Sequence, residues 1–260
     1  NVGDLTVISR TSVQQYRDTE KTTAQIAREL GVKWVMEGGV QEMGDRIQVN
    51  AQLIDPRTDA HAWAESYRRD LTTEDLFAIQ SEITKKIAGS LEARLTEGER
   101  DRVEETPTDD LAAYEAFLRG RSQFWQYLGQ WRPDLVEGSI ESLRAAVAAD
   151  SAFAEAHAWL GMAYTYRGLE EQWLDSARVA VRRAREIDPE LPSVHLARAF
   201  VNARQDSSAA EVEAYRRVLA LQPGNALARA ELSEHLVEQD EPLEALRLAR
   251  AAVLLDPRRP

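Results

Sequence analysis

The spacing of apolar residues changes near residue 105 and divides the chain into two parts. Before this point, short β-type runs alternate with helical patterns, whereas after it the pattern is helical throughout and rich in alanine. The acidic stretch 104–110 contains Pro107 and is typical of a solvated hinge. We therefore predict two domains, at residues 1–105 and 106–260.

The first part predicts a small α+β domain with a mixed or antiparallel sheet. Residues 5–8 form a short β-branched run, which predicts a strand. A helical pattern then begins at Thr22 or Thr23, either of which is a suitable N-cap, and ends at Gly31.

A β-hairpin is the clearest element of this part. Residues 34–43 form one run, Gly44-Asp45 a turn, and residues 46–54 a returning strand in which apolar and polar residues alternate. Such alternation is typical of a sheet with one buried and one polar face. A further strand over residues 61–67 and an amphipathic helix over residues 75–95 complete the predicted domain.

The second part repeats itself. Pro189, Pro223 and Pro257 each close a helical segment, and successive prolines lie 34 residues apart. A fixed period near this length indicates stacked helix–turn–helix units, each with an apolar stripe that only a neighbouring unit can bury. We predict four units, over residues 110–151, 152–189, 190–223 and 224–257.

These units resemble tetratricopeptide repeats (TPR). The best single match is the second unit, with Trp159-Leu160-Gly161, Tyr164, Gly168, Ala177, Ala184 and Asp188-Pro189. The first unit is degenerate, and the third has Arg198 where the pattern usually has Leu. The resemblance implies an all-α TPR superhelix and does not identify a ligand.

The first part resembles the α/β domain called TolB-amino-terminal-like or FlgO-like. The matching stretches are residues 7–13, 26–32, 37–40, 51–55 and 61–65. Residues 113–121 resemble the segment that opens the repeats in those proteins. The resemblance implies a bacterial signalling protein, since such proteins carry an adenylate or guanylate cyclase, a protein kinase or a winged-helix domain upstream. A membrane helix often lies between, which implies a periplasmic or membrane-tethered location. None of those modules is in this sequence, so the resemblance implies no catalytic residue.

One departure from the resembling domain concerns its start. That domain normally begins with an earlier strand and helix, which this sequence lacks, and the sequence starts at Asn1 without Met. We therefore expect a fragment with an open sheet edge, which favours pairing with a second copy as a homodimer.

Composition narrows the classes of function. The chain has 260 residues, no Cys and a formal net charge of −12. The lack of Cys excludes disulfides, thiolate metal sites, iron–sulfur clusters and cysteine nucleophiles. The acidic balance argues against nucleic-acid binding, which needs clustered Lys and Arg. No apolar run approaches the roughly 20 residues of a membrane span, so we expect no membrane insertion within this chain.

Motifs for catalysis are weak, and we expect no enzyme activity, metal or cofactor. The four histidines are His61, His157, His195 and His235. No two of them have the spacing of a metal site, and positions in the core or on the surface explain them better. Gly38-Gly39 lacks the context of a phosphate-binding loop. The hydroxyls and guanidinium of residues 9–12 favour helix capping, with an anion site as the alternative.

The predicted binding surface is the concave groove of the repeats, which the first helix of each unit lines. Its candidate residues are Tyr114, Phe117, Arg121, Trp125, Met162, Tyr166, Phe200, Arg204 and Glu234. Aromatic and Arg side chains supply many hot spots at interfaces, although the aromatic ones also fit a core between helices. Mixed charge along the groove favours a protein or peptide partner.

We therefore predict a non-catalytic protein-interaction and regulatory region of a bacterial signalling protein. Two other hypotheses stay open. One is a structural factor of envelope assembly that acts through self-association, and the other is a small-ligand sensor built on residues 9–12.

Overall fold

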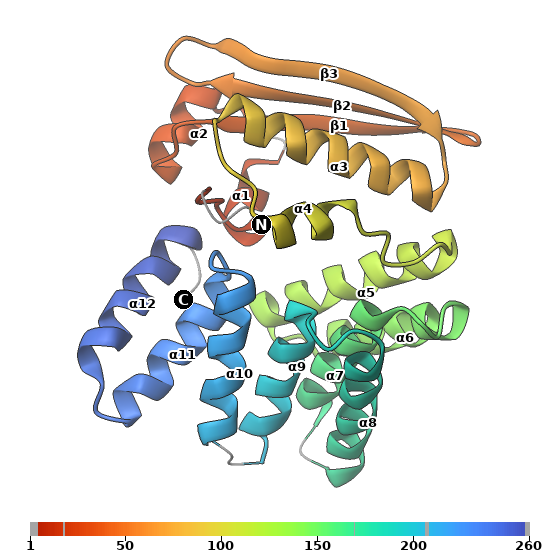
Figure 1. The fold of residues 1–260 in the computed structure, drawn as a ribbon, viewed down its shortest axis with the longest axis vertical. Helices are drawn as coiled ribbons and strands as arrows, with labels where there is room; N and C mark the ends of the chain where they lie inside the picture. Colours follow the sequence, from red (N-terminus) through yellow and green to blue (C-terminus); the bar gives the residue numbers. More distant parts are fainter. Residues whose placement is uncertain (1–4, 18, 169, 206–207, 258–260) are drawn as a thin grey trace. The chain divides into compact units, whose positions relative to one another are not determined.

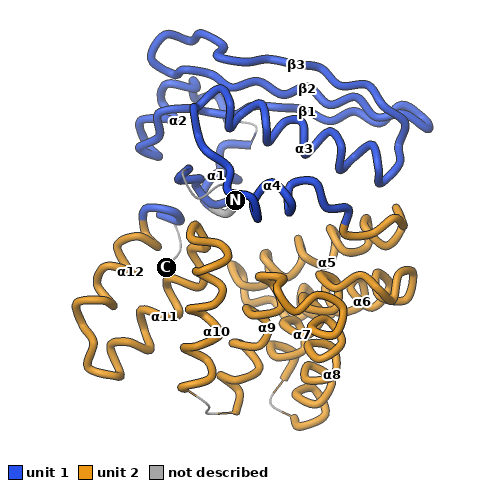
Figure 2. Tube along the Cα trace, viewed as in Figure 1, with its two compact units in different colours: residues 1–106, 254–260 blue, residues 107–253 orange. Residues whose placement is uncertain are grey.

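A computed structural model describes residues 5–17, 19–168, 170–205 and 208–257 (Figure 1). The side chains of Arg10 and Thr11 lie outside this described part. The chain divides into two compact units, one of residues 1–106 with 254–260 and one of residues 107–253 (Figure 2).

The first unit combines a three-stranded sheet with short and long helices. Its elements in chain order are α1 (Arg10–Val13), η1 (Gln14–Tyr16), α2 (Thr23–Leu30), β1 (Val35–Met43), β2 (Arg46–Asp55), β3 (Ala60–Asp70), α3 (Thr73–Ser90) and α4 (Glu97–Glu104). The strands form an antiparallel meander in the order β1-β2-β3. The predicted small antiparallel sheet with helices is therefore confirmed.

The alternation in β2 builds the two faces of this sheet. Ile47, Ala51 and Leu53 are buried on one face, along which α3 lies (Figure 1). Ile79 of α3 packs there against Ile47 and Tyr67, which closes a small core. The residues between them in β2 are polar and lie on the opposite face, as the period of two requires.

Local sequence signals explain the ends of two elements. Thr22 forms a capping box with Gln25 at the start of α2, and Gly31 ends that helix at φ 66°. Gly44 opens the β1–β2 turn at φ 68°, a conformation that favours glycine. The predicted helix over residues 75–95 exists, but it ends earlier, at Ser90, because Glu92 adopts a left-handed conformation at φ 53°.

The strand predicted over residues 5–8 is wrong. These residues have no regular structure, and the side chain of Val7 is 56% exposed. The next residue, Ser9, donates its backbone N–H to the carbonyl oxygen of Leu255 at 2.7 Å rather than to a strand. A β-branched run forms a strand only when it pairs with a neighbouring strand, and residues 5–8 do not join the sheet.

The second unit is a stack of antiparallel helix pairs. Its elements are α5 (Leu111–Gln130), α6 (Pro133–Ala149), α7 (Ala154–Arg167), α8 (Glu171–Ile187), α9 (Pro192–Ala203), α10 (Ser208–Leu221), α11 (Ala226–Glu238) and α12 (Pro242–Leu255). We call α5, α7, α9 and α11 the first helices and the others the second helices. Each pair occupies one sequence period, which confirms an all-α TPR-type repeat after the α+β part.

Glycine lets the two helices of a pair approach closely. A Cβ on Gly120 of α5 would meet Leu143 Cγ of α6 at 2.7 Å and the carbonyl oxygen of Ser139 at 3.0 Å. Ser139 also donates its hydroxyl to the Gly120 carbonyl oxygen at 2.9 Å. Gly161 of α7 has the same role, since its added Cβ would meet Val181 of α8 at 2.5 Å. These glycine contacts set the spacing within the pairs α5–α6 and α7–α8.

Replacing Gly120 with Ala therefore tests the packing. We expect Gly120→Ala to lower the free energy of unfolding by about 1–3 kcal/mol, because the methyl group overpacks a tight contact. Gly129 lies on the same helix with nothing within 4 Å of an added Cβ. Gly129→Ala should leave stability unchanged or raise it by up to about 1 kcal/mol. Urea denaturation of both variants measures this, and equal effects would contradict the account.

Candidate protein-interaction surface

An aromatic network joins three first helices of the repeat unit. Tyr166 of α7 lies at its centre, with ring centroids 5.5 Å from Phe124, 5.8 Å from Tyr127, 6.4 Å from Trp131 and 5.7 Å from Phe200. Most of these pairs are edge-to-face, the arrangement that the ring quadrupole favours. The network thus holds α5, α7 and α9 side by side.

Trp131 is the exposed end of this network. It follows α5 in a left-handed conformation at φ 54° and donates its backbone N–H to the Tyr127 carbonyl oxygen at 2.7 Å. Glycine is the usual residue at this position of a helix end, because a side chain there costs energy. The side chain of Trp131 is nevertheless 65% exposed. The fold therefore presents a large aromatic ring on a strained backbone.

A charged pair lies further along α5. Arg121 lies 4.0 Å from the carboxylate of Glu155 on α7, and its guanidinium stacks over the Phe117 ring at 5.0 Å from the centroid. Both charged side chains are about one-third exposed. Burial raises the pKa of Glu155, and the positive charge of Arg121 opposes that rise. The pair is thus partly desolvated and still accessible from solvent.

These side chains define a surface that we call the first-helix surface. It consists of partly or fully exposed residues of α5, its C-terminal cap and α7, namely Tyr114, Arg121, Trp125, Trp131, Glu155 and Tyr166. Trp125 joins it through a ring contact with Trp159 at 5.6 Å. Aromatic rings beside an ion pair are the composition of an interface centre rather than of a solvated helix face.

The structure separates the nine candidate residues into two groups. Tyr114, Arg121, Trp125 and Tyr166 are partly exposed, Arg204 is exposed directly after α9, and Glu234 is exposed on α11. Phe117, Met162 and Phe200 are 1%, 0% and 6% exposed, so they belong to the core and not to a binding surface. Neighbouring rings pack on two of them: Phe153 lies 4.9 Å from Phe117, and Tyr166 lies 5.7 Å from Phe200.

Sequence reasoning missed Trp131 and Glu155. Trp131 lies after the last residue of α5, where the repeat pattern gives no position to it. Glu155 lies in the first turn of α7, where an acidic residue is explained by the helix dipole alone. Only the contact of Glu155 with Arg121 on another helix reveals the pair.

The four histidines lie apart. His61 is exposed on β3, His157 contacts the Ser151 carbonyl oxygen at 3.1 Å, and His235 contacts the Glu211 carboxylate at 2.7 Å. In the described residues, no group of three or more His, Cys, Asp or Glu side chains is placed to hold a metal ion. No helix there is both long and apolar enough to cross a bilayer.

The corner at residues 9–12 is a packing site. Ser12 is buried, and its hydroxyl donates to the carboxylate of Asp256 at 2.6 Å. Its backbone N–H is 3.3 Å from the Ser9 hydroxyl oxygen, as in a helix cap. The Arg10 and Thr11 side chains lie outside the described residues. A carboxylate partner for Ser12 argues against the anion site considered from the sequence.

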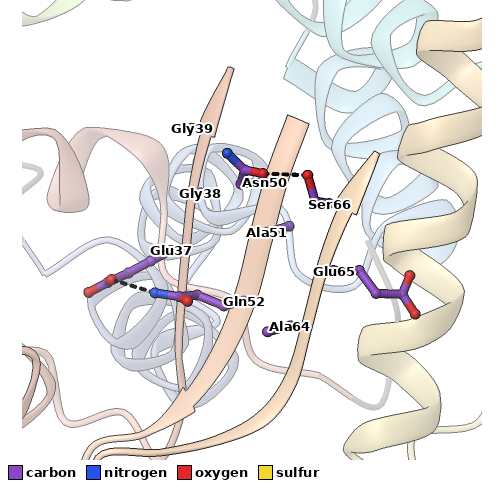
Figure 3. A pocket seen from close by; sticks show the side chains of 9 residues that line it. All are labelled: Glu37, Gly38, Gly39, Asn50, Ala51, Gln52, Ala64, Glu65 and Ser66. Carbon is purple, nitrogen blue, oxygen red and sulfur yellow. Dashed lines mark hydrogen bonds between the residues drawn. The ribbon is translucent and has the colours of Figure 1, made fainter. Parts of the chain in front are cut away.

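An open hollow of about 520 Å³ lies over the sheet instead (Figure 3). On its polar side, the Gln52 amide donates to the Glu37 carboxylate at 3.1 Å, and the Ser66 hydroxyl donates to the Asn50 side-chain oxygen at 2.6 Å. The glycines of β1 leave one wall without side chains. Because its polar groups already pair with one another, the hollow offers little to a small ligand.

Comparison with known proteins gives one curated relative and several solved structures. No model of a known protein family matches the chain. Over 126 residues, 48% of its length, the chain is 41% identical to a protein of Rhizobium meliloti (strain 1021) named "Putative adenylate cyclase 3", of which the match covers 21%. The chain thus spans about a fifth of that relative.

The solved structures have low sequence identity to the chain. TTC0263, a thermophilic TPR protein of Thermus thermophilus, is 19% identical with a TM-score of 0.47, over 72% of this chain and 91% of that one. MamA protein is 18% identical with a TM-score of 0.38, over 70% of this chain and 90% of that one.

His195 gives a pH-dependent test of the repeat packing. It is 7% exposed on α9, and burial lowers its pKa, with the positive charges of Arg198 and Arg217 acting in the same direction and Glu190 opposing them. Because the folded pKa lies below the unfolded value of 6.5, the unfolded chain binds more protons between the two values. The stability due to neutral His195 is therefore complete above that unfolded value and is lost as the pH falls below it.

Substituting His195→Gln should remove this dependence. We expect the parent to lose more unfolding free energy than the variant between pH 7.5 and pH 5.5, because only the parent must bury an imidazolium or give up its proton. Urea denaturation at both pH values, with the same buffers, measures the difference. An identical pH dependence in the two proteins would show that His195 has an ordinary pKa in the folded state.

Proposed function

We propose that this chain is a non-catalytic interaction and regulatory region of a bacterial signalling protein. Residues 1–105 would form an α+β domain of the TolB-amino-terminal-like type, and residues 106–260 four TPR units that bind a protein or peptide partner. The observation that carries the proposal is the first-helix surface, where an exposed tryptophan adjoins an aromatic network and a partly buried ion pair lies further toward the start of the same helices.

The chemistry of this surface favours a protein partner. Trp, Tyr and Arg supply most of the binding energy at protein interfaces, and they act best when neighbours exclude water around them. Trp131 rests on Tyr127 and Tyr166, so its ring is held in place before a partner arrives. An ordered ring loses less conformational entropy on binding than a free one. Arg204 and Glu234 would extend the contact along α9 and α11.

The signalling context rests on the curated relative. Identity of 41% to a protein named as an adenylate cyclase supports a role beside a cyclase output domain. In that role, partner binding to the repeats would change the activity of a domain outside this chain, with the α+β domain between them. Coupling of this kind requires that the partner bind two states of the protein with different affinity.

Self-association is part of the proposal. If two copies associate, their association gives a second way to regulate the output domain. The envelope-assembly hypothesis also requires two copies to associate. The exposed strand β1 is the element that would supply it.

Replacing Trp131 with Gly tests the partner site. Gly suits the left-handed conformation, so Trp131→Gly removes the ring while relieving about 1–2 kcal/mol of backbone cost, which offsets the lost ring contacts. The chain would serve as bait in lysate from the native cells, and the recovered partner would then be titrated by calorimetry. We expect Trp131→Gly to weaken binding by roughly 30-fold, the effect of losing one hot-spot residue.

Asp240→Gly is the matched control. Asp240 also has a left-handed backbone, at φ 62° after α11, but it carries no ring. This variant should bind the partner as the parent does. Equal affinity of all three proteins for the partner would contradict a role for the first-helix surface, and equal loss in both variants would indicate a backbone effect instead.

A further inference from the structure

Strand β1 is a long and exposed sheet edge. Among the described residues, β1 pairs with β2 on one side only, and every residue of the strand after Val35 is exposed. Met36, Val40 and Met43 are 50%, 63% and 49% exposed. An edge strand with unpaired backbone groups and apolar side chains is a template for pairing with another strand.

The opposite edge is protected against such pairing. Strand β3 has a register shift opposite Leu53 and Ile54, which interrupts its regular pairing. It also carries charged residues, two of which contact α3: Glu65 lies 2.9 Å from Lys86, and Arg69 lies 3.7 Å from Glu82. Bulges and charges are the usual means of blocking an edge, and β1 has only two charged residues along its length.

The hairpin fixes which backbone groups of β1 are free. Its turn has two residues, so Met43 and Arg46 form the first hydrogen-bonded pair of the ladder. Every second residue from Met43 therefore directs its backbone N–H and C=O toward β2. The residues between them, Met36, Gly38, Val40 and Glu42, direct theirs to the free edge.

A second copy of β1 fits this edge in one register. If two antiparallel copies meet on a two-fold axis at Gly39, all nine residues find a partner, and each outward-directed residue faces another such residue. Val40 then lies over Gly38 of the second copy, which leaves room for its side chain. Moving the axis to Gly38 or Val40 leaves residues at both ends of the ladder unpaired.

Charge supports the same register. With the axis at Gly39, Glu37 faces Gln41 of the second copy and Glu42 faces Met36, so the acidic residues of the two copies never oppose each other. Like charges directly opposite one another would destabilise the pair. Gly39 itself has nothing within 4 Å of an added Cβ in the described chain, so it leaves the axis open.

We propose that two copies of this chain associate by antiparallel pairing of β1 about Gly39, which joins their sheets into one of six strands. The inference rests on the self-association in the proposed function but not on the partner of the first-helix surface, since it concerns different residues and can hold whether or not that partner exists. Main-chain hydrogen bonds supply the affinity, and the side chains at positions 37 and 41 set the register.

Two substitutions at Gln41 should shift the association in opposite directions. Gln41→Lys creates two opposite-charge pairs with Glu37 per dimer, and Gln41→Glu creates two like-charge pairs. Each change should alter the dissociation constant by roughly 2- to 30-fold, tighter for Lys and weaker for Glu. Analytical ultracentrifugation of the 260-residue chain over a concentration series measures the constant. Gln41 is exposed, so both variants should fold.

Two controls separate the register from a general charge effect. Glu37→Gln combined with Gln41→Glu removes the repulsion and should restore the parent constant. Ala62→Lys and Ala62→Glu place the same charges at an exposed position of β3 and should change nothing. A parent that stays monomeric at every concentration overturns the proposal. A dissociation constant that is unchanged by the Gln41 substitutions, or that changes with those at Ala62, also overturns it, since the copies would then meet elsewhere.

Discussion

Close approach of the two helices in the pairs α5–α6 and α7–α8 is the constraint on which the first-helix surface depends. Gly120 and Gly161 bring α5 onto α6 and α7 onto α8 so closely that an added Cβ would lie 2.7 Å and 2.5 Å from the facing side chains. Buried alanines such as Ala113, Ala146 and Ala177 continue these contacts. Because the second helices take up one side of each first helix, the aromatic residues of successive first helices must pack against one another.

The first-helix surface follows from that packing. Tyr166 fills the space between α5 and α9, and the rings that it orders extend outward to Trp131. A core that continues to the surface leaves an ordered aromatic group where a partner can reach it. The sheet shows the same principle in another form, since α3 covers β2 and β3 while β1 keeps an exposed edge. Each unit thus keeps one set of ordered groups exposed to solvent.

Periodic patterns made most of the fold predictable from the sequence. The repeat period, the alternation in β2 and the caps at Thr22 and Gly31 are local signals, and each element that they predicted exists. Residues 5–8 had the right composition for a strand but do not join the sheet, and composition alone does not show whether a run pairs. The burial of Met162 and Phe200, and the pair between Arg121 and Glu155, depend on neighbouring helices, which a pattern along one helix does not describe.

Site-specific photo-crosslinking in native cells tests the central claim most directly, that the first helices rather than the second bind a protein. One protein would carry a photoreactive residue at Trp131, and the other at Val179, which is exposed on second helix α8. The account predicts a discrete crosslinked partner from position 131 and none from position 179. Adducts from position 179 alone, or the same adducts from both, would contradict it.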